Sequence, residues 1–149
     1  MGSKLPAIAR ILMGLTFTVF GLNGFLQFLP QPKTMPEGVA AFAGAMLKTG
    51  YLFQLVSGTQ LVVGLLLLAN RFVPLALTLL APILVGMAYF HAMLAPAGIA
   101  PALVFVAMEL VLAWSYRDAF SPMLRAGVSP VAPVARGELR AIEPAARVG

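Results

Sequence analysis

Apolar residues fill four long stretches of the chain, and short breaks that contain proline, glycine or charged residues separate them. The stretches cover residues 6–29, 51–69, 72–94 and 101–120. Each approaches the ~20 residues that an α-helix needs to cross the hydrocarbon core of a bilayer. The pattern therefore predicts an all-α fold, an integral membrane four-helix bundle within residues 1–120.

The break between the first and second stretches shows a helical pattern of its own. Thr34 and Glu37 have the spacing of a capping box, which would start a helix with Thr34 as its N-cap. Apolar residues then recur at helical spacing over residues 35–46, and Gly50 can end the helix. We expect a short amphipathic helix over residues 35–48 in the first outer loop, lying on the membrane surface or across the end of the bundle. An ordered loop without a function is the alternative.

The sequence changes character after residue 120. Residues 121–149 contain four prolines and scattered charges, and they contain no aromatic residue. Such a segment buries too little apolar area to offset the entropy lost on ordering. We expect residues 121–149 to form a disordered cytoplasmic tail.

Composition supports a membrane location. Hydrophobic residues make up 60% of the chain and charged residues only 10%, against about 25% charged residues in typical soluble proteins. The net charge is +5, and a basic balance can indicate nucleic acid binding, but in so apolar a chain it favours basic residues retained at the cytoplasmic membrane face. We therefore predict the lipid bilayer, and no nucleic acid, as a partner. The chain has no cysteine, which excludes disulfides and thiolate metal sites.

The basic residues also predict an orientation. In the four-span arrangement, most of them fall on one side, at Lys4, Arg10, Arg71, Arg117 and Arg125. The other side has only Lys33, Glu37 and Lys48. Because lysine and arginine near short loops favour the cytoplasm, both termini are expected on the cytoplasmic side of the membrane.

Several glycines lie inside the apolar stretches. They are Gly14, Gly21, Gly24, Gly58 and Gly64. Small residues allow the backbones of two membrane helices to approach closely. We expect these positions to lie at helix–helix contacts.

A few polar side chains interrupt the apolar stretches, and the outer half contains most of them. They are Asn23, Gln27, Gln54, Gln60 and His91, with Thr16 and Phe20 on the same face of the first stretch as Asn23. Because polar groups within a bilayer face the protein interior or water, we expect these side chains to line one outward-opening cavity and bind a ligand. The alternative is that the amides only join helices by hydrogen bonds.

Glu109 lies near the middle of the fourth stretch, with no other charge within one helical turn. An ionisable group at this depth is costly and is a functional candidate by default. We expect Glu109 to face the same cavity and to act as a proton relay. With one histidine and one such carboxylate, the chain is predicted to hold no metal and no covalent cofactor.

The order and spacing of several short runs resemble those of the DoxX family over residues 9–124. The runs are Arg10–Leu15, Val19–Phe25, Met46–Tyr51, Gly64–Leu68, Asn70–Leu77, Phe90-His91, Leu94–Gly98, and Glu109 with Trp114–Phe120. The resemblance implies a four-helix bundle in a bacterial inner membrane. The family is named after a small subunit of a thiosulfate:quinone oxidoreductase, and other members are linked to oxidative-stress complexes. Many members have a lysine after the glycine-rich turn of the first helix, where this chain has Asn23-Gly24-Phe25.

Three functions are consistent with these features. In the first, the chain is a redox-linked accessory subunit that binds quinone or a similar small ligand, and a protein partner supplies the electrons. The chain would then not be a self-sufficient enzyme, but a subunit of a quinone-linked oxidoreductase. In the second, the chain is a non-enzymatic scaffold or assembly factor. In the third, it is a small transporter that works as a homodimer.

Overall fold

The computed structural model describes residues 4–30 and 34–127 of the chain, and within these residues all regular structure is helical. The elements are α1 (Lys4–Leu26), α2 (Glu37–Lys48), α3 (Leu52–Leu68), α4 (Val73–Met93), the short 3₁₀ helix η1 (Pro96–Gly98), α5 (Ile99–Ser115) and α6 (Arg117–Phe120). The prediction of an all-α fold is confirmed for the described residues. Of the predicted tail, residues 128–149 lie outside the described residues.

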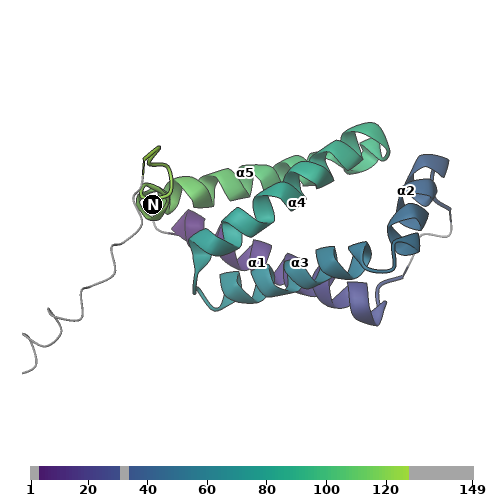
Figure 1. Ribbon diagram of the computed structural model, residues 1–149, viewed down its shortest axis with the longest axis horizontal. Coiled ribbons are helices and arrows are strands. Elements are labelled where there is room, and N and C mark those ends of the chain that lie inside the picture. The colour runs from purple at the N-terminus through teal and green to yellow at the C-terminus, as the bar shows by residue number, and fades with distance from the viewer. Residues whose placement is uncertain (1–3, 31–33, 128–149) are drawn as a thin grey trace, which may run out of the picture.

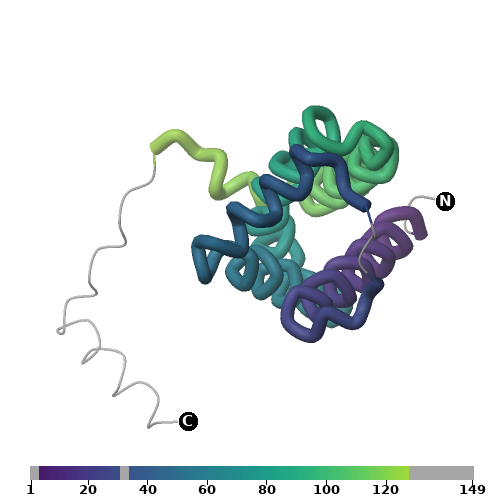
Figure 2. The backbone as a smooth tube through the Cα atoms, turned by 90° about the vertical axis from the view of Figure 1, so that its right-hand side faces the viewer, coloured from purple at the N-terminus to yellow at the C-terminus, as the bar shows by residue number. Residues whose placement is uncertain are grey.

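The four long helices run beside one another in two pairs (Figure 1). Helix α1 packs along α3, and α4 packs along α5, while α3 also contacts α4 and α1 also contacts α5. Helix α2 does not follow this direction. It is bent by 92° from α3, and it crosses in front of the helix ends when the molecule is viewed along them (Figure 2).

Glycines bring α1 and α3 into close contact. A Cβ atom added at Gly21 would lie 2.5 Å from the backbone nitrogen of Leu61, and one at Gly64 would lie 2.5 Å from the backbone nitrogen of Thr18. A Cβ at Gly24 would collide with the side chain of Ser57. A Cβ atom at Gly14 would likewise come too close to the side chain of Leu68. The predicted close approach of two helices is therefore confirmed at four of the glycines. At Gly58 a Cβ would make only an ordinary contact, 3.7 Å from Phe25.

Apolar side chains fill the interior and also make up much of the outer surface. Met13, Leu67, Leu80 and Leu112 are fully buried, whereas large side chains such as Trp114 are exposed. Among the described residues, three helical segments are long and apolar enough to cross a membrane: Lys4–Leu26, Val73–Met93 and Pro96–Ser115. The bent pair of α2 and α3 gives a fourth if it is counted as one span. The fold is therefore compatible with a multi-pass membrane protein.

Helix α1 ends earlier than the predicted boundary at residue 29. The N–H of Gln27 donates the last helical hydrogen bond, to the carbonyl of Asn23 at 2.8 Å, and Gln27 then takes a positive φ of 49°. The side chain of Asn23 accepts a second bond, from the N–H of Leu29 at 2.7 Å. These hydrogen bonds satisfy groups at the helix end, and the chain turns away from the helix axis before it reaches Pro30. Gln27, which was expected inside the first apolar helix, therefore lies just beyond its end.

Helix α2 confirms the predicted loop helix but not its capping box. Its N-cap is Pro36, without a side-chain hydrogen bond, so Thr34 does not cap the helix. The reason is steric: the ring of Pro36 disfavours helical geometry at Met35, and the helix cannot begin until the proline has passed. At the other end, Gly50 has a φ of 76°, as expected for a glycine that ends a helix.

The fourth apolar stretch is not one uninterrupted helix over residues 101–120. After the single turn of η1, α5 begins at Ile99 and ends at Ser115, and Tyr116 separates it from the short α6. The hydroxyl of Tyr116 donates to Asn70 at 3.3 Å, so this break is joined to the connection between α3 and α4.

Candidate functional site

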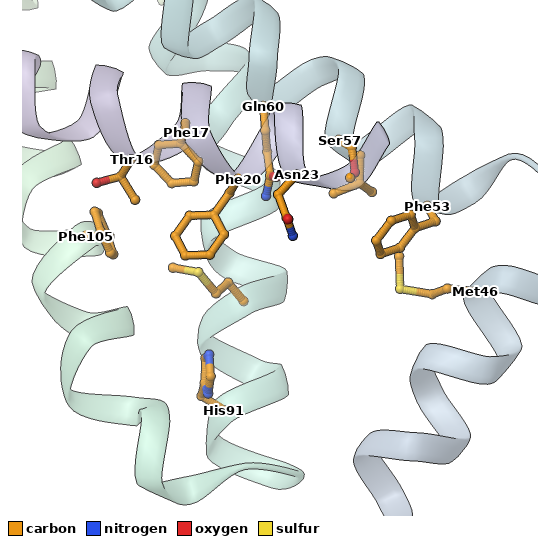
Figure 3. A pocket seen from close by; sticks show the side chains of 13 residues that line it. Thr16, Phe17, Phe20, Asn23, Met46, Phe53, Ser57, Gln60, His91 and Phe105 are labelled. Carbon is orange, nitrogen blue, oxygen red and sulfur yellow. The ribbon is translucent and has the colours of Figure 1, made fainter. Parts of the chain in front are cut away.

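A cavity of about 320 Å³ lies between α1, α3, α4 and α5, with one residue of α2 in its wall. Its polar lining residues are Thr16, Asn23, Ser57, Gln60 and His91. Its larger apolar lining residues are Phe17, Phe20, Met46, Phe53, Met87 and Phe105. Figure 3 shows the labelled side chains of this lining, which come from several helices and lie around the cavity. A mostly apolar cavity of this size with a few polar groups is typical of small-ligand sites.

Asn23 is held in one orientation by its own chain. Its side-chain oxygen accepts a hydrogen bond from the N–H of Leu29 at 2.7 Å. Because a backbone N–H can only donate, the atom it contacts must be the amide oxygen and not the nitrogen. The NH₂ group of Asn23 is thus the part of the amide left for the cavity, where Figure 3 shows the side chain.

Three contacts position the side chain of His91. Its Nδ1 lies 3.2 Å from the carbonyl oxygen of Ala95. The ring of Phe90 meets the imidazole edge-on, with 5.2 Å between the centroids. Gly98 lies close to the ring edge that holds Nδ1 and Cε1, since a Cβ atom there would collide with both atoms. The turn between α4 and α5 therefore positions the ring, which points into the cavity in Figure 3.

Gln60 provides an amide from α3. It is half-buried, and no hydrogen bond joins its side chain to another residue within the part of the chain that the structure describes. A primary amide has both donors and acceptors. Gln60 can therefore donate a hydrogen bond to a ligand carbonyl or accept one from a ligand hydroxyl.

Aromatic rings form much of the wall. Phe17 and Phe105 meet edge-to-face with centroids 5.6 Å apart, and they join α1 to α5. Phe20 and Phe53 line the cavity from α1 and α3. Flat aromatic ligands pack well in such a space, because ring pairs prefer offset or edge-to-face contacts over a range of angles.

Helix α2 covers the cavity on one side. Phe42 packs against Phe90 of α4, with 5.3 Å between the ring centroids, and Met46 lines the cavity. Every residue of α2 is exposed or half-buried. Thr49 joins α2 to α3, since its hydroxyl donates to the carbonyl of Met46 at 2.7 Å and accepts from the N–H of Leu52 at 3.0 Å.

The structure brings together three of the predicted site residues, namely Asn23, Gln60 and His91. Gln54 is exposed and lines a separate open groove of about 400 Å³ with Leu55 and Leu79. Gln27 is exposed beyond the end of α1 and is not a lining residue of the cavity. The expected convergence of all six polar residues is thus reduced to three.

Glu109 is buried, with 8% of its surface exposed, but it does not line the cavity. It lies one turn beyond Phe105 on α5, and its Oε2 atom has no hydrogen-bond partner among the described residues. Gly98, which touches His91, precedes Glu109 by eleven residues (109 − 98) on the same helical segment. This separation corresponds to about 16 Å along a helix, so Glu109 and His91 do not share one hollow.

Three further residues line the cavity and were not predicted from the sequence, namely Phe53, Met87 and Phe105. Phe53 lies four residues before Ser57 and seven before Gln60, so the helical period places it on the polar face of α3. That spacing was the available signal. Met87 lies four residues before His91, so the same period places it on the polar face of α4. Phe105 lies four residues before Glu109, but the structure places Glu109 outside the cavity, so that spacing does not indicate the wall.

Comparisons with protein-family models, with curated proteins and with solved structures found no match to this chain. The resemblance to the DoxX family therefore stays a prediction from the sequence. Within residues 4–30 and 34–127, no group of three or more histidine, cysteine, aspartate or glutamate residues could hold a metal ion.

Proposed function

We propose that this chain is a DoxX-like membrane protein that crosses a bacterial inner membrane four times, with both termini in the cytoplasm. The distribution of charge supports this orientation. Arg10 donates to the carbonyls of Leu67 and Leu68, which places it at the same end as Arg71 and the connection between α3 and α4. Among the described residues, Glu37 and Lys48 are the charged groups at the opposite end, where α2 lies.

In this arrangement α3 is a short span and α2 lies in the outer interface. Helix α3 has 17 residues, which span about 25 Å, close to the ~30 Å hydrocarbon core. Tyr51 precedes it at the outer end, where aromatic side chains favour the membrane surface. The 92° bend then turns α2 toward the membrane plane, as expected of an amphipathic interfacial helix.

We further propose that the cavity binds the head group of a quinone or a similar flat, polar aromatic molecule. One observation supports this most directly: the polar side chains of Asn23, Gln60 and His91, from three different helices, line one cavity with several aromatic rings. A quinone ring would pack against the rings, and its oxygens would reach the amides and the imidazole. The volume of about 320 Å³ lies at the lower end of the range for ligand pockets and suits a single head group.

The chain would act as an accessory subunit of an oxidoreductase. Quinone reduction needs electrons and a proton supply as well as a binding site. The sequence has no cysteine and no cofactor-binding motif, so a partner protein would supply the electrons. Glu109 lies one turn below the aromatic floor formed by Phe17 and Phe105, and a proton path through it would require these rings to move.

A matched pair of glutamine variants tests the binding proposal. Gln60→Leu removes the amide inside the cavity, whereas Gln54→Leu removes the same group from the exposed groove on the same helix. Loss of one hydrogen bond to a ligand in a largely desolvated site costs about 1.4 kcal/mol, or a tenfold change in affinity. Titration calorimetry of the full chain in nanodiscs, with 1,4-naphthoquinone as the probe, should show this loss for Gln60→Leu only.

The scaffold alternative predicts a different result. Empty nanodiscs give the background for partition of the probe into lipid. If the parent protein binds no more probe than empty nanodiscs, or if both glutamine variants bind like the parent, the cavity is not the proposed quinone site.

A further inference from the structure

We propose that the cavity prefers ligands with an aromatic hydroxyl over ligands with two carbonyls, that is, the quinol form over the quinone form. This inference deepens the proposed binding function and rests on it. It arises from two side chains, Asn23 and His91, whose hydrogen bonds to the backbone leave them with opposite roles toward a ligand.

Asn23 offers the ligand only a donor. Its oxygen is already bound to the N–H of Leu29, at the point where α1 ends. Turning the amide over would place its NH₂ group against that N–H and leave two donors facing each other. Because an unsatisfied pair of this kind is unfavourable, the NH₂ group stays toward the cavity. Asn23 therefore selects an oxygen that accepts.

His91 offers the ligand an acceptor. The carbonyl of Ala95 can only accept, so the Nδ1 atom beside it must hold a proton. In the neutral imidazole, Nε2 is then the nitrogen without a proton, and its lone pair accepts. Turning the ring over would place a carbon atom beside the carbonyl of Ala95 and lose this hydrogen bond, so the contact with Ala95 also favours the observed ring orientation.

A quinol satisfies both groups, whereas a quinone satisfies one. The hydroxyl of a quinol can donate to Nε2 of His91 while its other oxygen accepts from Asn23. A quinone has acceptors alone, and one of its carbonyls would face the lone pair of His91. Gln60 does not discriminate between the two forms, because its amide can both donate and accept.

Three stable ring compounds isolate this difference. 4-Methoxy-1-naphthol has one hydroxyl and one acceptor, 1,4-dimethoxynaphthalene has two acceptors, and 1,4-naphthoquinone has two carbonyls. All three share the same ring system. We expect the parent protein in nanodiscs to bind the naphthol at least tenfold more tightly than either other compound, after subtraction of partition into empty nanodiscs.

Variants assign the preference to a residue. His91→Phe keeps an aromatic ring but removes the acceptor, and it should bring the three affinities to within about twofold of one another, a margin smaller than one hydrogen bond. Gln54→Leu, outside the cavity, should keep the tenfold preference. Thermal unfolding followed by circular dichroism checks that both variants fold.

The outcomes separate the two proposals. If none of the three compounds binds above background, the proposed function fails and this inference fails with it. If all three bind with similar affinity and Gln60→Leu weakens each, the cavity is a ligand site but the preference for a hydroxyl is wrong. Tighter binding of the quinone than of the naphthol would mean that the cavity face of His91 donates, as a doubly protonated ring does, and would also overturn the inference.

Discussion

The two ends of the molecule are built from the same helices but are packed in opposite ways. At the end near the connection between α3 and α4, Met13, Leu67, Leu77 and Leu112 are buried in one continuous core. At the end covered by α2, the same four helices surround a cavity with polar groups in its wall. The aliphatic side chains that fill the core give way there to aromatic rings and a few polar side chains around open space.

This difference follows the sequence of each helix. Along α1, Ala9, Met13 and Phe17 face the core, and the next residues on that side are Phe20 and Asn23. Along α3, Leu67 and Val63 give way to Gln60 and Ser57 in the same direction. Because the change occurs on both helices at the same end, the cavity is a feature of the chain and not a single packing defect.

Substitution at the contact between α1 and α3 should have the largest effect, because both ends depend on it. Gly21→Leu places a side chain against the backbone of Leu61, where nothing can move aside. We expect a loss above about 4 kcal/mol of unfolding free energy, or failure to accumulate. Gly86→Leu is the matched control, since a Cβ atom there meets nothing within 4 Å. Thermal unfolding in detergent measures both, and equal stability would contradict the close packing of α1 on α3.

Shortening a side chain should destabilise the protein more in the packed core than in the wall of the cavity. Leu77 is 2% exposed in the core, whereas Met87 on the same helix α4 lines the cavity. Leu77→Ala leaves a void and should cost about 2–4 kcal/mol, while Met87→Ala enlarges an existing space and should cost less than about 1 kcal/mol. Unfolding with a denaturing detergent gives both values. Equal losses would mean that the cavity end is as tightly packed as the core.

The attachment of α2 should show the smallest effect. Thr49→Ala removes the hydroxyl that joins the end of α2 to the start of α3, and should cost about 1 kcal/mol. Thr34→Ala should change the stability by no more than a few tenths of a kcal/mol, because Thr34 does not cap α2. Hydrogen exchange of the α2 amides is the measurement. A larger effect at Thr34 than at Thr49 would restore the capping box and contradict the helix start at Glu37.

The sequence predicted the helices well because long apolar stretches and helix-breaking residues are local signals. It predicted the end of α1 poorly, since at that end the N–H of Leu29 donates a hydrogen bond to the side chain of Asn23, which no hydrophobic pattern reveals. The capping-box spacing predicts too early a start for α2, because it does not include the effect of Pro36 on the residue before it.

The candidate site was predicted only in part. Asn23, Gln60 and His91 were found because polar residues in an apolar stretch stand out and face inward. Gln54 follows the same rule in sequence, yet it is exposed, since only one of two glutamines six residues apart can face a given neighbour. Glu109 was predicted to join the cavity from its depth, but the Phe17–Phe105 pair lies between them, and contacts between side chains of distant helices are not visible in the sequence.

Photolabelling tests the central claim, that the polar residues of three helices surround one binding cavity, most directly. The full chain in nanodiscs would be irradiated with an azido-1,4-naphthoquinone, and the labelled residues mapped by mass spectrometry. We predict labels on Phe53, Met87 and their neighbours around the cavity, which excess 4-methoxy-1-naphthol removes. Labels spread over exposed side chains outside the cavity, such as Leu110 and Trp114, and unaffected by the competitor, would contradict the account.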